Sequence, residues 1–133
     1  MKPDSSWRIV VRWVLAGCFV LAGLNHFLSP KIYLGMVPPW LPAPEMANVV
    51  SGAAEIVGGL GLLFSKYRRI AGWGLIALLL AVFPANLHVA LQGHMPGLNA
   101  SPLILWLRLP LQPGLIAWVW WAALRRSPPG GTL

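Results

Sequence analysis

Residues 46–64 read MANVVSGAAEIVGGLGLLF, a mainly apolar stretch with the length of a transmembrane helix. A helix of this length crosses a hydrocarbon core of about 30 Å at a rise of about 1.5 Å per residue. Its centre nevertheless holds Glu55, and a carboxylate inside a membrane is costly unless it is neutralised or paired. The other two acidic residues, Asp4 and Glu45, lie in the polar N-terminus and in a proline-rich loop. Glu55 is therefore the first candidate for a functional-site residue.

The composition is that of an integral membrane protein. Only 10% of the 133 residues are charged and 57% are hydrophobic, whereas soluble domains are about 25% charged. Three more apolar stretches are long enough to span a bilayer. We expect an all-α, four-helix up-down transmembrane bundle in a single domain over residues 1–126, followed by a disordered tail at 127–133. The predicted spans are residues 8–27, 46–64, 70–91 and 103–124.

The distribution of charge predicts the orientation in the membrane. The net charge is +7, but most basic residues fall on one side of the predicted spans. The positive-inside rule then places both termini in the cytoplasm. Such a pattern predicts contact with anionic lipid rather than with nucleic acid. The basic residues on this side are Lys2, Arg8, Arg12, Lys66, Arg68, Arg69, Arg125 and Arg126.

The N-terminal and cysteine features restrict the chemistry. No small-residue cleavage site follows the first span, so we expect a retained helix rather than a signal peptide. Cys18 is the single cysteine. A dithiol redox mechanism within this chain is therefore excluded.

The first outer loop, residues 28–45, is too apolar for an ordinary water-exposed connection. Because Tyr and Trp prefer the headgroup region, we expect this segment to lie in the outer interface and cap the bundle. Both an interfacial anchor and a lid over a site remain open. Its aromatic and proline residues include Tyr33, Pro38, Pro39, Trp40, Pro42 and Pro44.

Asn48, Ser51 and Glu55 recur at i, i+3 and i+7, and so they form one stripe on the second span. Gly58 and Gly59 continue this face, where small residues allow a neighbouring helix to approach closely. We expect the stripe to point into the bundle. Glu55 is then either a site residue or a structural partner in a hydrogen bond or ion pair.

Arg108 and Gln112 lie four residues apart and share a face of the last span. The most economical arrangement pairs Arg108 with Glu55; snorkelling of Arg108 to the interface is the alternative. We expect Pro110, Pro113 and the following glycine to interrupt this helix. Broken helices at membrane depth commonly border a site, although kinks that only shape packing remain possible.

His26 and His88 lie at the outer ends of the first and third spans. Asn86 is two residues before His88, about 200° around a regular helix, so both face the centre only if Pro84 distorts the turn. All four spans thus place a polar side chain in the outer half of the membrane, which predicts a shared, outward-opening pocket. Each histidine is alternatively a hydrogen-bonding residue at the interface.

Two ligands suit these groups. His26, His88 and Glu55 form a donor set that suits zinc, copper, iron or manganese, but no diagnostic spacing is present. The same groups suit a quinone, because His and Arg can contact its carbonyl oxygens while Glu carries protons. The cofactor stays open between these two, with a metal the less favoured. The candidate ligand or proton-site residues are Glu55, His26, His88, Asn86, Arg108 and Gln112.

The chain resembles the DoxX-like family of small four-helix membrane proteins. The resemblance lies in AGLNHF at 22–27, SGAAEI at 51–56, FPANLH at 83–88 and RLPLQ at 108–112. It implies a multi-pass protein of the bacterial inner membrane. Some relatives are linked to oxidoreductase systems, including thiosulfate:quinone oxidoreductase, and others to maturation of periplasmic enzymes. The six candidate residues above occupy motif positions, and none carries an established catalytic role.

The leading hypothesis is a membrane subunit of a redox or quinone-linked system with a partner protein. The chain has no self-contained catalytic motif, so it is at most a subunit of an oxidoreductase complex. A non-enzymatic scaffold or maturation factor is the main alternative. Metal or small-solute handling is a third, for which a homo-oligomer would enlarge the path.

Overall fold

The computed structural model describes residues 4–95, 99 and 101–126, and its elements are helices. The all-α prediction is confirmed for this part of the chain. The elements are α1 (Ser6–Leu28), α2 (Pro30–Met36), α3 (Pro44–Gly61), α4 (Arg68–Gln92), α5 (Pro102–Val119) and the π-helical turn η1 (Trp120–Leu124). The predicted tail at 127–133 lies outside the described residues.

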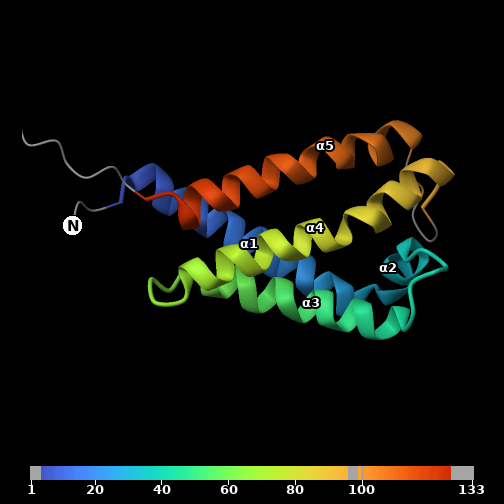
Figure 1. Cartoon of the computed structure of the whole chain (residues 1–133), viewed down its shortest axis with the longest axis horizontal. Coiled ribbons are helices and arrows are strands. Elements are labelled where there is room, and N and C mark those ends of the chain that lie inside the picture. The colour runs from blue at the N-terminus through green and yellow to red at the C-terminus, as the bar shows by residue number, and fades with distance from the viewer. Residues whose placement is uncertain (1–3, 96–98, 100, 127–133) are drawn as a thin grey trace, which may run out of the picture.

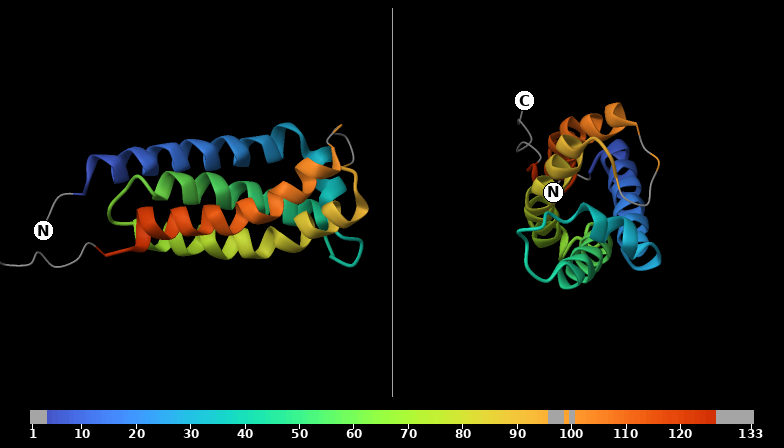
Figure 2. Two further views of the ribbon diagram at one scale, coloured as in Figure 1. Left: turned by 90° about the horizontal axis from the view of Figure 1, so that it is seen from above. Right: turned by 90° about the vertical axis from the view of Figure 1, so that its right-hand side faces the viewer.

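The long helices α1, α3, α4 and α5 extend along the long axis of the molecule, and the short α2 lies at one end (Figures 1 and 2). α1 and α4 run in one direction, and α3 and α5 run in the other. α3 packs against both α1 and α4, whereas α5 packs chiefly against α4. The first and last described residues therefore lie at the same end, which we call the terminal end.

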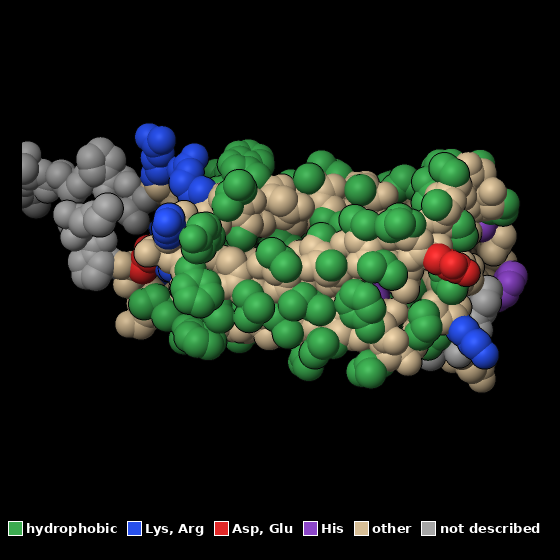
Figure 3. All heavy atoms as spheres, turned by 90° about the horizontal axis from the view of Figure 1, so that it is seen from below, with side chains coloured by type: hydrophobic (Ala, Val, Ile, Leu, Met, Phe, Trp, Pro, Cys, Tyr) green, Lys and Arg blue, Asp and Glu red, His purple; other side chains and the backbone are tan. Residues whose placement is uncertain are grey.

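Three helical segments are long and apolar enough to cross a membrane: Ser6–Leu28, Arg68–Gln92 and Pro102–Leu124. The sequence predicts four such spans, and three of them meet this requirement in the structure. α3 falls short because its 18 residues include Glu45, Asn48, Ser51 and Glu55. Hydrophobic side chains cover the length of the molecule between its ends, and Lys and Arg gather at the terminal end (Figure 3).

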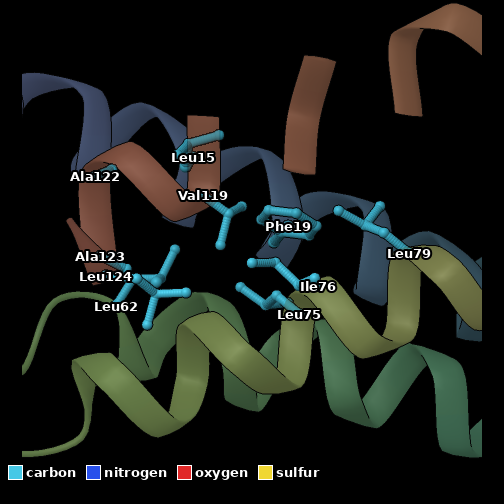
Figure 4. Packing of buried hydrophobic residues seen from close by; sticks show 10 residues of the cluster. All are labelled: Leu15, Phe19, Leu62, Leu75, Ile76, Leu79, Val119, Ala122, Ala123 and Leu124. Carbon is cyan, nitrogen blue, oxygen red and sulfur yellow. The ribbon is translucent and has the colours of Figure 1, made fainter. Parts of the chain in front are cut away.

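The main core lies toward the terminal end and joins α1, α4, α5 and η1 (Figure 4). Leu15, Leu75 and Val119 are each at most 2% exposed. A second cluster lies toward the opposite end of the helices and contains Met36, Val89, Ala90, Met95 and Leu105. These two clusters fix α4 against α5 at both ends of the molecule.

The prolines do not interrupt the helices. α4 continues through Pro84, and α5 continues through Pro110 and Pro113, so the expected break in the last span is wrong. Each proline removes one amide donor, and a side chain bridges the two helices nearby: Gln112 Nε2 donates to the carbonyl of Leu79 at 3.0 Å. This bond adds a polar contact between α4 and α5.

The chain before α1 is tied to the helices by Asp4. Its two carboxylate oxygens lie 3.5 Å from Arg8 Nη1 and 2.6 Å from Arg12 Nη1. Ser5 caps α1 by accepting a bond from the Arg8 amide at 3.3 Å. Asp4, Arg8 and Arg12 are spaced by four residues, which places them along one side of the helix start.

Acid should loosen this N-terminal attachment. The Arg12 hydrogen bond lowers the pKa of Asp4 below its ordinary value of 3.8. A carboxyl whose pKa is lower in the folded state stabilises the fold above its ordinary pKa, and that contribution is lost as the pH falls through the folded value. Thermal unfolding in detergent is measured from neutral pH down to about pH 3. The unfolding temperature of the wild type should fall over this range by an amount that Asp4→Asn does not show. Equal acid sensitivity in both proteins would contradict it.

Candidate functional site

α1 and α3 touch backbone to backbone where Gly23 faces Gly52. A Cβ placed on Gly23 would lie 2.7 Å from the Gly52 carbonyl oxygen and 3.0 Å from the Ile56 nitrogen. A Cβ on Gly52 would lie 2.8 Å from Cβ of His26. Small residues allow such an approach between helices. The crossing therefore brings His26 of α1 directly onto the polar stripe of α3.

The polar stripe of α3 faces inward as predicted, but the two glycines that follow it contact different helices: Gly59 contacts α1 and Gly58 contacts α4. Asn48, Gly52 and Gly59 are buried, and a Cβ on Gly59 would meet α1 at 3.1 Å from the carbonyl oxygen of Ala16. Gly58 faces Leu75 of α4 instead, at 2.7 Å. α3 thus uses adjacent glycines to approach two different helices.

His26 and Asn48 form a reciprocal pair. His26 is 8% exposed and Asn48 is 7% exposed. Asn48 Nδ2 donates to the backbone carbonyl of His26 at 3.0 Å, and Asn48 Oδ1 lies 2.7 Å from His26 Nδ1. Because the amide oxygen only accepts, Nδ1 must carry a hydrogen. The other ring nitrogen, Nε2, is left for a different partner.

That partner is Glu55, whose Oε2 lies 3.3 Å from His26 Nε2. The Glu55 side chain is 16% exposed, and Oε2 itself is buried without a well-aligned hydrogen bond. A neutral ring with its hydrogen on Nδ1 presents a lone pair at Nε2, which would repel an ionised carboxylate. The contact is attractive when a proton resides on Nε2 or on Oε2. The geometry therefore builds a position for one proton between α1 and α3.

α2 closes one side of this site. The Tyr33 ring stacks on the His26 ring with centroids 3.7 Å apart and planes 21° apart. Its hydroxyl accepts a hydrogen bond from Asn25 Nδ2 at 2.8 Å. Tyr33 also packs against the second apolar cluster. The predicted cap is thus partly helical and lies directly on His26, whereas Trp40 beyond it is 69% exposed.

The expected ion pair between Arg108 and Glu55 is wrong. Arg108 Nη1 instead donates to the thioether of Met95 at 3.5 Å, a weak acceptor. The reason is the order of the helices: Glu55 on α3 meets α1, whereas Arg108 belongs to α5, which packs chiefly on α4. Met95 belongs to the apolar cluster against which Tyr33 packs, so Arg108 lies toward the same end of the molecule as the site but is bound to Met95 and not to Glu55.

The remaining candidates lie elsewhere. Gln112 is 5% exposed; its Nε2 binds Leu79, and its Oε1 is buried without a partner among the described residues. Asn86 and His88 are half-buried and form no hydrogen bond with the described residues. The described part of the chain also holds no group of three or more His, Cys, Asp or Glu that could bind a metal. The suggested set of His26, His88 and Glu55 is therefore not assembled.

Two cavities lie away from this cluster. An apolar groove of about 560 Å³ runs beside α3 and α4 and is lined by residues that include Val57, Gly61 and Gly74. A smaller cavity of about 290 Å³ lies at the terminal end beside Asp4 and Arg12. Neither is lined by His26 or Glu55, so the outward-opening polar pocket stays a prediction.

Two contacts of the site go beyond the sequence predictions. The helical spacing places Asn48 on the inward stripe without indicating its partner, and the aromatic pattern assigns Tyr33 to the interface rather than to His26. The available signal is the pair Asn25–His26 at a helix end, followed seven residues later by Tyr33. His26 and Tyr33 are seven residues apart, which would place them on the same side of one continuous helix. Because the helix ends before Ser29 and a new one begins after it, this spacing alone does not predict the contact.

Comparison with known proteins places the chain in a family. No curated protein and no solved structure matches the sequence. One family model matches residues 15–123, which include all of the paired site residues, and nothing in the match links the chain to the DoxX-like proteins. The chain belongs to the family described as Domain of unknown function (DUF8561).

Proposed function

We propose that this chain is a multi-pass protein of the bacterial inner membrane, with four transmembrane helices in up-down order and both termini cytoplasmic. Three helices meet the requirement by length and composition. α3 can be the fourth because its buried polar groups face α1 rather than lipid, as with Asn48 and its bonds to His26. The arginines at the terminal end support the cytoplasmic assignment.

Within the membrane, we propose that His26 and Glu55 form a proton-carrying site of a redox or quinone-linked system. The observation that carries this proposal is the contact of 3.3 Å between Nε2 and Oε2, because Nδ1 is already committed to Asn48. Intramembrane ionisable groups of this kind are typical of proton relays. Quinone reduction takes up protons at carbonyl oxygens, and a partner protein would supply the electrons.

Infrared difference spectroscopy of the protein in nanodiscs tests the proton site. The band contributed by the Glu55 carboxyl should be absent from Glu55→Gln and remain in Glu45→Gln, the matched control on the exposed start of α3. Titration with a ubiquinone analogue should show binding in the wild type and in Glu45→Gln. No quinone binding by the wild type, together with unchanged activity of the partner complex in Glu55→Gln, would rule out the redox proposal.

A second candidate is a non-enzymatic scaffold or maturation factor. The favouring observation is that several residues of this chain contact His26: Asn48 binds its ring and backbone, and Tyr33 covers one face of the ring. Such a network can serve only to lock α1 to α3. It predicts that a stabilised variant lacking Glu55 keeps partner function, whereas the proton-carrying role predicts its loss.

A further inference from the structure

A second cluster of buried charge lies at the terminal end, outside the His26 site. Its cavity of about 290 Å³ has a charged part and an apolar part. Lys and Arg side chains gather at this end of the molecule (Figure 3). The residues that line the cavity are Asp4, Ile9, Arg12, Trp13, Leu63 and Arg68.

Backbone carbonyls fix the two cavity arginines. Arg12 is 5% exposed, and its Nε donates to the carbonyl of Ala122 in η1 at 2.6 Å. Arg68 Nε donates to the carbonyl of Leu62 at 3.0 Å. Both guanidinium groups are therefore held in place through Nε at the wall of the cavity, where their Nη1 atoms face Asp4. A preorganised guanidinium of this kind suits phosphate, which it can bind through two parallel hydrogen bonds.

The cluster keeps a positive surplus. Asp4 Oδ2 lies 2.6 Å from Arg12 Nη1 and 3.9 Å from Arg68 Nη1, and its Oδ1 lies 3.5 Å from Arg8 Nη1. Asp4 thus faces both cavity arginines, and one carboxylate cannot neutralise their two charges. Basic pockets between membrane helices on the cytoplasmic side attract anionic headgroups. A further anion here would be stabilised by charges that Asp4 does not neutralise.

The apolar part of the cavity favours a lipid over a free ion. Ile9 is 44% exposed and Trp13 is 63% exposed, and both lie beside the arginines. Tryptophan prefers the headgroup level of a bilayer. Inorganic phosphate would satisfy the arginines and leave these side chains uncovered, whereas a phospholipid covers both parts.

We propose that Arg12 and Arg68 bind the phosphate of an anionic phospholipid, with its glycerol and upper acyl chain against Ile9 and Trp13. The proposal rests on the membrane placement given above and is independent of the proton site. Asp4 competes with the lipid phosphate for the same guanidinium groups.

Lipid retention measured by native mass spectrometry of the full chain tests this assignment. The protein in detergent is mixed with phosphatidylglycerol, and inorganic phosphate is added as the competitor. Arg68→Gln should weaken retention roughly fivefold, since one arginine near a lipid surface contributes about that much. Arg69→Gln is the matched control, because Arg69 is adjacent, exposed and not part of the cavity lining.

Asp4→Asn is expected to increase lipid retention, a result that misfolding of the variant would not produce. Removal of the competing carboxylate should raise phosphatidylglycerol retention, and a loss in Arg68→Gln alongside this gain supports the site. Equal loss in Arg68→Gln and Arg69→Gln, or no gain in Asp4→Asn, would overturn it. Displacement of the lipid by an equal concentration of inorganic phosphate would overturn the choice of lipid. None of these variants alters His26 or Glu55, so failure here is distinguishable from failure of the proton-carrying function.

Discussion

Gly23→Val should lower the free energy of unfolding by about 1–3 kcal/mol or more, as overpacking of a tight contact does. A Cβ at this position would lie 2.7 Å from the Gly52 carbonyl oxygen and 3.0 Å from the Ile56 nitrogen. Both atoms belong to the α3 backbone, so no side-chain rotation can make room. The helices would have to separate, and His26 would move away from Asn48 and Glu55.

Unfolding by denaturant in detergent micelles, followed by circular dichroism, measures this loss. Gly17→Val is the matched control, because Gly17 lies on the same helix and a Cβ added there would have nothing within 4 Å. The control should unfold at nearly the midpoint of the wild type. Equal destabilisation by the two variants would show that the cost comes from valine in a helix and not from the α1–α3 contact.

His26→Leu should destabilise the protein by about 3 kcal/mol at neutral pH. A buried carboxylate that loses its partner costs about 3–5 kcal/mol, and the 16% exposure of Glu55 favours the lower end of that range. The variant also leaves the side chain of Asn48 without its ring partner. Most of the penalty should therefore come from Glu55 rather than from lost packing.

A double variant separates these causes. His26→Leu combined with Glu55→Gln should recover a large part of the lost stability, since the uncompensated charge is gone. His88→Leu is the matched control, because His88 forms no hydrogen bond with the described residues, and its loss should cost less than about 1 kcal/mol. If the stability losses of His26→Leu and Glu55→Gln simply add in the double variant, His26 and Glu55 do not interact.

Helical periodicity is sufficient to predict the inward face of α3. Asn48, Ser51 and Glu55 share one side of any regular helix, and the structure buries Asn48 and leaves Glu55 only partly exposed. Charge distribution likewise predicts that the basic residues gather at one end, as Figure 3 shows. Both inferences need only local spacing and the order of spans along the chain.

The partner of Glu55 required the tertiary structure. The position of each residue along its span predicts that His26, His88 and Arg108 lie at the same end of the molecule. It does not predict which of them faces α3. That choice depends on which helices are neighbours and how each is rotated about its axis. The Gly23–Gly52 contact fixes both for α1 and α3, and Arg108 on α5 is directed to Met95 instead.

An all-helical, strongly apolar chain with a polar stripe on α3 follows from the amino-acid order alone, because composition and periodicity are properties of single segments. The contact of Glu55 with His26, the cover of Tyr33 over the ring, and the meeting of Arg12 and Arg68 at Asp4 emerge only in the folded molecule. These contacts join residues from separate elements of the chain. Packing between helices sets such contacts, and spacing along one helix does not encode them.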